Sequence, residues 1–360
     1  MSMQNEATPT PINAEDRIVI IGVNTILGEL ILDRLERNPK IQEFWSIDLH
    51  PPKTSKKFKK LRFLKMDLIE PGADAKLAEK LKEIGATVLV HATSKNNPSL
   101  QWVNAHELEV IGTLNMVSAA KAAQIRKFVF CSTTAVYGAS PKNPNYIAES
   151  APLDPHPVAH FVRDKVEAEK QVASLHQDAP QILITTLRFS LIVGPRSKNY
   201  FTELFRRRIV PTLLGYDPLM QFLSEDDAAD ALEKAVLEDF RGIFNIVGRG
   251  VVPLSYALRE ANKVGFPIAG FVAYPVIQIL WNLQLLSVPG RLLDYFRYLW
   301  VADGEKAKRV MNFEPKMSSK EAFVEFAKYR RLEDYKGEFK ASSRLKREDQ
   351  GEAQAARKSG

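Results

Sequence analysis

The chain has 360 residues, and at about 150 residues per domain this length corresponds to two structural units or one large α/β unit. Its 45% hydrophobic and 26% charged residues exclude a disordered chain, a collagen-like chain and a disulfide-stapled mini-protein. The net charge of +7 is local, because residues 53–65 hold seven basic and no acidic residues and residues 336–360 add a net +3. No zinc finger, aromatic RNA motif or basic recognition helix accompanies them, so we expect solvated basic segments and no nucleic-acid site. Contact of residues 53–65 with anionic lipid or nucleic acid is the weaker alternative.

Apolar runs alternate with helical patterns along the chain. Residues 1–16 are polar with two prolines, and we expect them to be disordered, as we do the charged tail of residues 336–360. The predicted strands are 17–21, 43–48, 61–65, 87–91, 127–132, 181–188 and 242–247, and the predicted helices between them include 26–36, 74–84 and 103–123. Continuous apolar strands that alternate with helices predict an α/β fold with a doubly wound parallel Rossmann sheet over residues 17–249. A smaller, mainly helical C-terminal region over residues 250–335 follows it.

A glycine-containing turn joins the first predicted strand to the first helix. It matches the pattern G-x-x-G-x-x-G, with a threonine in the middle position. The first glycine allows a tight turn, the last lets the helix pack close to the sheet, and the helix N-terminus then faces a pyrophosphate. Two glycines alone are a weak signal, since many strand-to-helix turns need them. The residues expected to meet the cofactor here are Gly22, Thr25, Ile26, Leu27 and Gly28.

An acidic residue follows the second predicted strand. Asp48 lies 20 residues after Gly28, where a carboxylate binds the two ribose hydroxyls of NAD, whereas a turn residue is the structural alternative. Its charge repels a 2′-phosphate, which favours NAD over NADP, although the basic stretch from Lys53 counts against this choice. The further residues expected beside the cofactor are Asp67, Leu68, His91 and Ala92, with His91 as a packed residue at the end of the fourth strand.

From the fifth strand onward, several segments agree in order with one enzyme family. The segments are C-S-T-T-A-V-Y-G at 131–138, L-R-F-S-L-I-V-G-P at 187–195, Q-F-L-S-E-D-D-A-A at 221–229 and F-N-I-V-G at 244–248. They resemble motifs of the extended, atypical short-chain dehydrogenase/reductases, also called NAD-dependent epimerase/dehydratases. The bacterial UDP-glucose-4-epimerase-like subgroup is the most similar one, since R-D-K at 163–165 resembles the end of its Y-S-R-D-K motif. The resemblance covers roughly residues 17–330.

The resemblance implies a catalytic set of a hydroxyl residue, a tyrosine and a lysine. Thr133 and Lys165 occupy the first and last positions, and Lys165 would also bind the nicotinamide ribose. Phe161 stands at the usual tyrosine position, four residues before Lys165, and has no proton to give. Three readings stay open: another group such as His160, Tyr137 or Tyr146 substitutes, the protein binds NAD(H) without turnover, or the reaction needs no such hydroxyl. A further departure is Glu109, where the family often has an asparagine that supports the proton relay to the lysine.

The remaining features concern metal, compartment and partners. His156 and His160 lack a third ligand, so no metal site is predicted. The single cysteine, Cys131, is expected to be a small buried hydrophobe in a reducing cytoplasm, and the N-terminus shows no secretory signal. Arg206-Arg207-Arg208 is read as a solvated helix face, with an anionic substrate as the alternative. Members of the family often dimerise through helices that flank the fourth and fifth strands, so a homodimer is a further expectation.

The segment from Val264 to Gly290 has no formal charge over 27 residues. Two lid helices packed on the sheet domain are the first interpretation. A lipophilic pocket or a peripheral contact at the inner membrane surface is the second, because Trp, Tyr and Arg follow at the border in an amphipathic helix over 291–300. A membrane span is the third, and three prolines argue against it. No clear counterpart of the arginine motif that grips the diphosphate of sugar nucleotides is visible.

Together these features predict an atypical NAD-dependent oxidoreductase or epimerase. Its small-molecule substrate would carry a hydroxyl or keto group and be either lipophilic or a sugar nucleotide, with residues 190–220 and 250–335 forming the substrate region. The alternative from a different class is a catalytically silent NAD(H)-binding protein, either regulatory or at a membrane surface.

Overall fold

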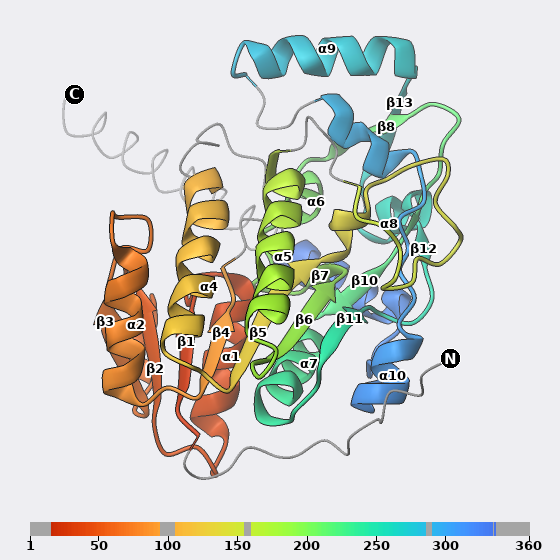
Figure 1. The fold of residues 1–360 in the computed structure, drawn as a ribbon. Helices are drawn as coiled ribbons and strands as arrows, with labels where there is room; N and C mark the ends of the chain where they lie inside the picture. The colour runs from red at the N-terminus through yellow and green to blue at the C-terminus, as the bar shows by residue number, and fades with distance from the viewer. Residues whose placement is uncertain (1–15, 94–104, 155–159, 286–289, 334, 336–360) are drawn as a thin grey trace, which may run out of the picture.

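The computed structural model describes residues 16–93, 105–154, 160–285, 290–333 and 335. Seven parallel strands form the central sheet in the order β11-β6-β5-β4-β1-β2-β3 (Figure 1). Their bounds are β1 Ile18–Ile21, β2 Phe44–Asp48, β3 Leu61–Lys65, β4 Val88–His91, β5 Lys127–Thr133, β6 Leu183–Phe189 and β11 Gly242–Ile246. The doubly wound parallel sheet is therefore confirmed, and the strand order reverses between β1 and β4.

Helices cover both faces of the sheet because its strands are apolar on both sides. Along β1, Ile18 and Ile20 pack with α1 (Ile26–Arg37) and α7 (Glu225–Leu237). Val19 and Ile21 point to the other face, which α2 (Ala73–Ile84), α4 (Gly112–Ala122) and α5 (His160–Asp178) cover. Successive side chains of a strand point to opposite faces, so an uninterrupted apolar run serves two helical layers at once. A π-helical turn, η2 (Glu107–Ile111), leads into α4.

A second apolar cluster holds the C-terminal region together around phenylalanines from segments far apart in the sequence, including Phe201, Phe222 and Phe323. Three two-stranded sheets belong to this half: β7 (Leu191–Val193) with β10 (Phe222–Ser224), β9 (Leu219–Met220) with β12 (Val252–Pro253), and β8 (Ile209–Leu213) with β13 (Val264–Ile268). The helices are α6 (Tyr200–Leu204), α8 (Leu254–Glu260), α9 (Gly270–Asn282), α10 (Glu305–Met311) and residues 319–333, and 3₁₀ turns lie at η1 (Ser55–Lys57), η3 (Thr134–Tyr137) and η4 (Gly290–Phe296).

The C-terminal region departs from expectation in two places. The uncharged segment after Val264 begins with a strand, β13, before the single helix α9. Residues 291–300 were expected to form an amphipathic helix, but residues 291–296 form nearly all of the 3₁₀ stretch η4 and a turn follows them. Among the helices that the structure describes, none has both the length and the apolar character needed to cross a bilayer.

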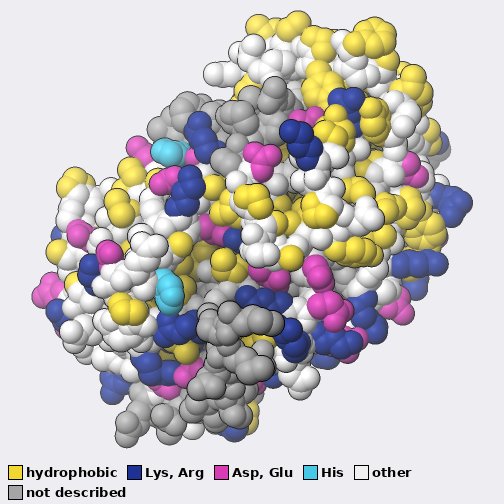
Figure 2. Space-filling view, turned by 45° about the vertical axis from the view of Figure 1, so that its right-hand side comes forward, with side chains coloured by type: hydrophobic (Ala, Val, Ile, Leu, Met, Phe, Trp, Pro, Cys, Tyr) yellow, Lys and Arg dark blue, Asp and Glu magenta, His cyan; other side chains and the backbone are white. Residues whose placement is uncertain are grey.

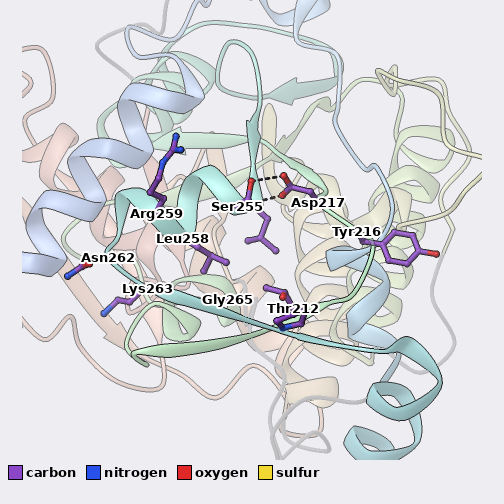
Figure 3. A pocket seen from close by; sticks show the side chains of 11 residues that line it. Thr212, Tyr216, Asp217, Ser255, Leu258, Arg259, Asn262, Lys263 and Gly265 are labelled. Atoms are coloured by element: carbon purple, nitrogen blue, oxygen red, sulfur yellow. Dashed lines mark hydrogen bonds between the residues drawn. The ribbon is translucent and has the colours of Figure 1, made fainter.

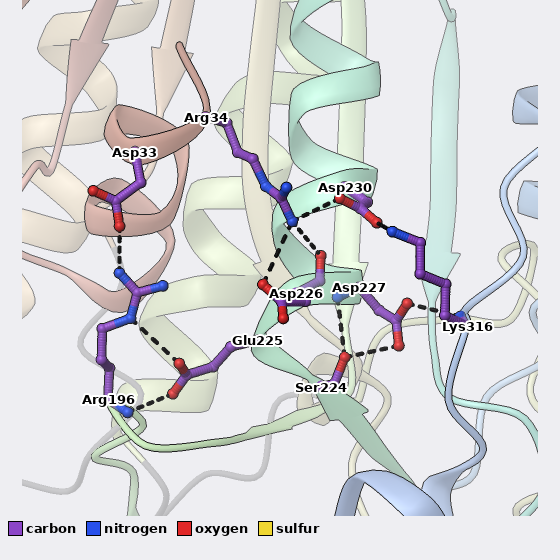
Figure 4. A network of polar contacts seen from close by, with 9 residues as sticks. All are labelled: Asp33, Arg34, Arg196, Ser224, Glu225, Asp226, Asp227, Asp230 and Lys316. Atoms are coloured by element: carbon purple, nitrogen blue, oxygen red, sulfur yellow. Dashed lines mark hydrogen bonds and ion pairs between the residues drawn. The ribbon is translucent and has the colours of Figure 1, made fainter. Parts of the chain in front are cut away.

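The acidic segment at 224–227 has a structural task (Figure 4). Ser224 caps α7 by accepting the N–H of Asp227, and Asp227 in turn accepts the N–H of Lys316 at 2.7 Å. Glu225 accepts the N–H and the guanidinium of Arg196, which also reaches Asp33 on α1. The segment therefore fixes α7 to α1, to the loop after β7 and to the chain leading into the helix of residues 319–333.

The disorder expected for the two ends of the chain concerns residues 1–15 and 336–360, which lie outside the described residues. Asp16, counted with the disordered N-terminus in the sequence interpretation, accepts a bond from Thr87 at 2.7 Å and pairs with Arg126 at 3.2 Å. The ordered chain thus includes the residue directly before β1.

Candidate functional site

The turn after β1 lies against the chain that leaves β4, at the point where the strand order reverses. Gly22 has a φ of +90°, a conformation that side chains other than glycine rarely adopt. A Cβ on Gly22 would lie 2.3 Å from the backbone nitrogen of Thr93, so the close approach of the two segments also needs glycine. In parallel α/β sheets, ligands bind in the crevice at such a reversal.

Thr25, in the middle position of the glycine pattern, caps the first helix. Its Oγ1 accepts the N–H of Gly28 at 3.1 Å and lies 2.8 Å from the carbonyl oxygens of both Gly22 and Ala92. The threonine side chain is thus turned into the protein and joins the β1 turn to the end of β4. Gly28 has no room for a Cβ, which would lie 2.1 Å from the oxygen of Gly22.

The other residues of the turn contribute their backbone to the crevice. The side chain of Leu27 is buried in the core, and Ile26 packs against that core while partly buried. The N–H groups at the start of α1 are therefore what this turn offers a phosphate.

Asp48, the last residue of β2, reaches back to the same turn. Its Oδ2 accepts the N–H groups of Gly22 and Val23, each at 3.2 Å, and its Oδ1 accepts that of Leu49 at 2.8 Å. Burial raises the pKa of the carboxyl, and these three backbone bonds act in the opposite direction. A carboxylate has about four acceptor positions, so at least one remains for a ribose hydroxyl.

The residues after β3 and at the end of β4 are held by local bonds. Asp67 accepts the N–H of Ile69 at 3.1 Å, and the buried Leu68 accepts a bond from Asn115 at 2.8 Å through its carbonyl oxygen. Ala92 is fully buried beside Gly22. These residues border the sheet edge where the cofactor is expected, and only the carboxylate of Asp67 keeps a polar side chain there.

Lys165 on α5 is buried, with 2% of its surface exposed. Its ammonium group forms an ion pair with Glu109 and donates to the carbonyl oxygens of Thr93 at 3.1 Å and Cys131 at 3.5 Å. All three N–H groups of Lys165 are therefore engaged within the protein. The partner is Glu109 of the π-turn η2, which is itself buried.

His91 connects this ion pair to the end of β4. One ring nitrogen lies 2.7 Å from Thr113 Oγ1 and the other 2.7 Å from Thr93 Oγ1. Because Thr113 donates its proton to the carbonyl oxygen of Glu109, it accepts from His91 Nε2, and Nδ1 accepts from Thr93. Burial, helped by the charge of Lys165, lowers the pKa of His91 well below its usual value, so the ring is neutral. His91 is thus a fully buried residue at the end of β4, and its place beside the cofactor stays a prediction.

Phe161 lies one turn before Lys165 on α5 and contacts an aromatic residue that the sequence interpretation missed. Its ring centre is 5.9 Å from that of Tyr200, the first residue of α6. The hydroxyl of Tyr200 is buried, has no hydrogen-bond partner among the described residues, and has a pKa raised by burial. A tyrosine at the start of a five-residue helix carries no sequence signal, because its proximity to Phe161 is created by the tertiary fold.

The hydroxyl group of Thr133, the last residue of β5, is available as a hydrogen-bond donor. Its Oγ1 accepts the N–H of Ala135 at 3.3 Å, and among the described residues it donates to no acceptor. The side chain is partly exposed. A substrate oxygen can therefore receive a hydrogen bond from this residue.

The three residues suggested as substitutes for the missing tyrosine lie in different surroundings. Tyr137 donates to Asn245 at 2.7 Å and accepts from Arg188 at 2.8 Å, so its hydroxyl belongs to a buried structural network. Tyr146 is 56% exposed. His160 is the first residue of α5, but its side chain lies outside what the structure describes.

Comparison with known proteins agrees with this geometry. The model of the NAD dependent epimerase/dehydratase family matches residues 18–246. The chain belongs to this family. An uncharacterized protein of Mycobacterium tuberculosis, Rv0501, is 27% identical over 320 residues, which cover 88% of this chain and 84% of the relative. NAD is the cofactor of the family, and the β1 turn, the N-terminus of α1 and the free acceptor position of Asp48 fit a dinucleotide.

Two further similar proteins carry names that specify a substrate. The fold matches the structure of UDP-glucose 4-epimerase with UDP-glucose from Thermotoga maritima with a TM-score of 0.67 and 19% identity, covering 88% of this chain and 99% of that one. N-acetyl-alpha-D-glucosaminyl-diphospho-ditrans,octacis-undecaprenol 4-epimerase of Escherichia coli O157:H7 is 28% identical over 103 residues, which are 28% of this chain and 30% of the relative. The names of these two epimerases specify a sugar nucleotide in one case and a lipid-linked sugar in the other.

Proposed function

We propose that this protein is an NAD-dependent oxidoreductase or epimerase that works without the tyrosine of its family. The observation that carries the proposal is the buried ion pair of Lys165 and Glu109, one helical turn from Phe161. In the family's chemistry the lysine has two tasks, which are to lower the pKa of the tyrosine and to hold the nicotinamide ribose. With Phe161 in place there is no phenol to ionise, and with Glu109 in place the lysine charge is already neutralised.

The two departures therefore fit each other. A lysine with 2% exposure is costly to bury, and Glu109 supplies the charge that makes it tolerable. What remains for Lys165 is the ribose, which it would bind by exchanging one of its long backbone contacts, such as the 3.5 Å contact to Cys131. Gly22, Thr25, Gly28 and Asp48 complete the proposed cofactor site.

Two hydroxyl groups are proposed to replace the missing phenol. Thr133 has a proton to donate to a substrate oxygen, and the hydroxyl of Tyr200 is buried beside Phe161 with no hydrogen-bond partner in the part of the chain that the structure describes. Because burial raises the pKa of Tyr200, its hydroxyl stays protonated at neutral pH and would act as a donor to a carbonyl or alkoxide oxygen. The bound cofactor would supply the hydride acceptor or donor.

The proposed substrate is a lipophilic alcohol or ketone, with a lipid-linked sugar as the form closest to the family's chemistry. The uncharged segment of residues 264–290, much of it exposed, and the name of the E. coli relative support this choice. A sugar nucleotide is the second candidate, favoured by the UDP-glucose bound to the Thermotoga relative.

Turnover tests the proposal against a silent NAD(H)-binding protein. Purified protein with NAD⁺ or NADH is assayed against lipophilic alcohols and ketones, a polyprenyl diphosphate sugar and UDP-glucose. The proposal expects turnover that disappears in Lys165→Ala and stays in Lys170→Ala, a solvent-exposed lysine of the same helix. Cofactor binding without turnover of any substrate would support the silent alternative instead.

Two partner and compartment proposals accompany this function. Homodimerisation would use α4 and α5, and Ile111 and Leu114 beside α5 are 40% and 49% exposed on that side of the sheet, available for such a contact. Sedimentation equilibrium of wild type and Leu114→Asp tests it, and a wild-type monomer would refute it.

A cytoplasmic location is supported by Cys131, a buried free thiol whose pKa burial raises to about 12.

A further inference from the structure

Helix α9 turns two polar side chains, Tyr274 and Gln278, toward the protein and a stripe of apolar side chains toward solvent. Tyr274 donates to Asp294 at 2.5 Å, and Gln278 accepts the N–H of Gly290 at 3.3 Å, so these polar groups face η4. On the opposite side, at about 100° per residue, four side chains fall within about 60° of one another. These outward residues, exposed by 42% to 62%, are Val272, Val276, Ile279 and Leu283. Phe271 at the start of the helix is 84% exposed.

The strand pair β8–β13 extends this surface. Its parallel register sets Ile209 beside Val264 and Pro211 beside Phe266, and all four side chains are exposed. Since α9 begins two residues after β13 ends, helix and strand pair adjoin, and we call these nine residues of α9 and β8–β13 together the apolar face. Figure 2 shows hydrophobic side chains gathered at the top of the molecule, where Figure 1 places α9.

The inner side of the strand pair is different in character. Thr212, Gly265 and Pro267 border a cavity of about 510 Å³ that they share with Leu254 and Leu258 of α8 (Figure 3). The strand pair is thus a peripheral layer whose outer side chains take no part in the core. Substituting those outer side chains should leave the fold intact.

Cationic groups border the apolar face. Segments 200–208 and 255–263, which lead into β8 and β13, hold five basic and two acidic residues, including the exposed Arg206-Arg207-Arg208. At the other border Arg297 donates to Tyr216 at 2.7 Å and lies over its ring. No acidic residue occurs from Val264 to Gly290. An apolar surface framed by Arg, Lys and Tyr complements anionic lipid headgroups above an apolar interior.

We infer that the apolar face docks the protein on the surface of an anionic lipid bilayer. A second copy is the less suitable occupant, because a twofold contact pairs the same patch with itself and brings the cationic borders together. A typical protein interface surrounds its apolar centre with a polar rim and carries about ten hydrogen bonds, whereas the outward stripe of α9 offers a protein partner no side-chain donor or acceptor. The inference goes beyond the proposed chemistry, because it concerns a surface formed without Lys165 or Phe161.

Vesicle co-sedimentation of the full-length protein tests the docking surface. Vesicles of phosphatidylcholine, with and without phosphatidylglycerol, are used over a range of salt concentrations. Wild type should bind vesicles containing phosphatidylglycerol, and more weakly as salt rises. Val276→Asp with Ile279→Asp should lower binding at least about tenfold. The control Leu332→Asp, on the helix of residues 319–333 and 59% exposed, should leave it unchanged.

Three results would overturn the inference. The first is the absence of wild type from the pellet with every vesicle, and the second is vesicle binding by the double aspartate variant equal to that of wild type. The third is a wild-type dimer that the double variant converts to a monomer in solution without vesicle binding, which would make the apolar face a subunit interface. Circular dichroism verifies that each variant is folded, and NAD binding, measured separately, shows whether the cofactor assignment fails independently of the docking surface.

Discussion

Replacing Glu109 by glutamine should destabilise the protein strongly, because it leaves the charge of Lys165 buried without a counter-ion. Both side chains are almost fully buried, at 8% and 2% exposure, so solvent does not screen the pair. Removal of one partner from such a pair costs about 3–5 kcal/mol. Lys165→Met should cost a similar amount, and the double variant should cost less than the sum of the two by at least about 2 kcal/mol, because it removes both charges together.

Equilibrium urea unfolding of the four proteins, followed by tryptophan fluorescence, measures this coupling. Glu167→Gln is the control, since Glu167 pairs with Lys170 at 3.8 Å on the exposed side of α5 and should change stability by less than about 0.5 kcal/mol. If the effects of Glu109→Gln and Lys165→Met add without coupling, the two groups do not form an isolated buried pair. The proposal that Glu109 neutralises the charge of Lys165 would then be wrong.

Three more predictions follow from the same site. Phe161→Tyr combined with Glu109→Asn should raise kcat about a hundredfold in the turnover assay, and Phe161→Tyr alone much less, because Glu109 still neutralises the lysine; equal gains would contradict the coupling. Tyr200→Phe should lower kcat about a hundredfold without lowering the unfolding temperature, since its hydroxyl makes no bond to the described residues; unchanged kcat would exclude it as the donor. His91 stays neutral in the folded protein, so only the unfolded chain gains its proton as the pH falls below about 6.5. The free energy of unfolding should then fall more steeply with decreasing pH in wild type than in His91→Gln, by up to about 1.4 kcal/mol per pH unit. The same dependence of the unfolding free energy on pH in the two proteins would contradict this.

The sheet could be predicted from the sequence because most of its strands are apolar runs bounded by polar residues. The same local pattern predicts that the turn at Gly22 follows β1 and that the carboxylate of Asp48 ends β2. A parallel sheet brings the ends of these two strands to one edge. The segments at 187–195 and 221–229 resemble family motifs, and in the structure Glu225 of the second segment accepts the N–H of Arg196, the residue directly after the first.

Features made by distant residues could not be read in this way. The pairing of β8 with β13 joins strands more than fifty residues apart, and neither strand shows an alternating pattern. The sequence shows that Glu109 departs from the family's usual asparagine. It does not show that the Glu109 carboxylate contacts Lys165, because that contact depends on the π-turn η2 and on the position of α5. The burial of the Tyr200 hydroxyl, which has no hydrogen-bond partner among the described residues, depends on the contact of α6 with Phe161 of α5.

The most direct test of the account is calorimetric titration of NAD⁺ and NADH into wild type and Asp48→Asn. The account predicts binding at one site per chain, with a Kd at least about tenfold higher in the variant, because an amide cannot accept the ribose hydroxyls as a carboxylate does. Failure of wild type to bind either form of the cofactor, with none retained through purification, would contradict the account.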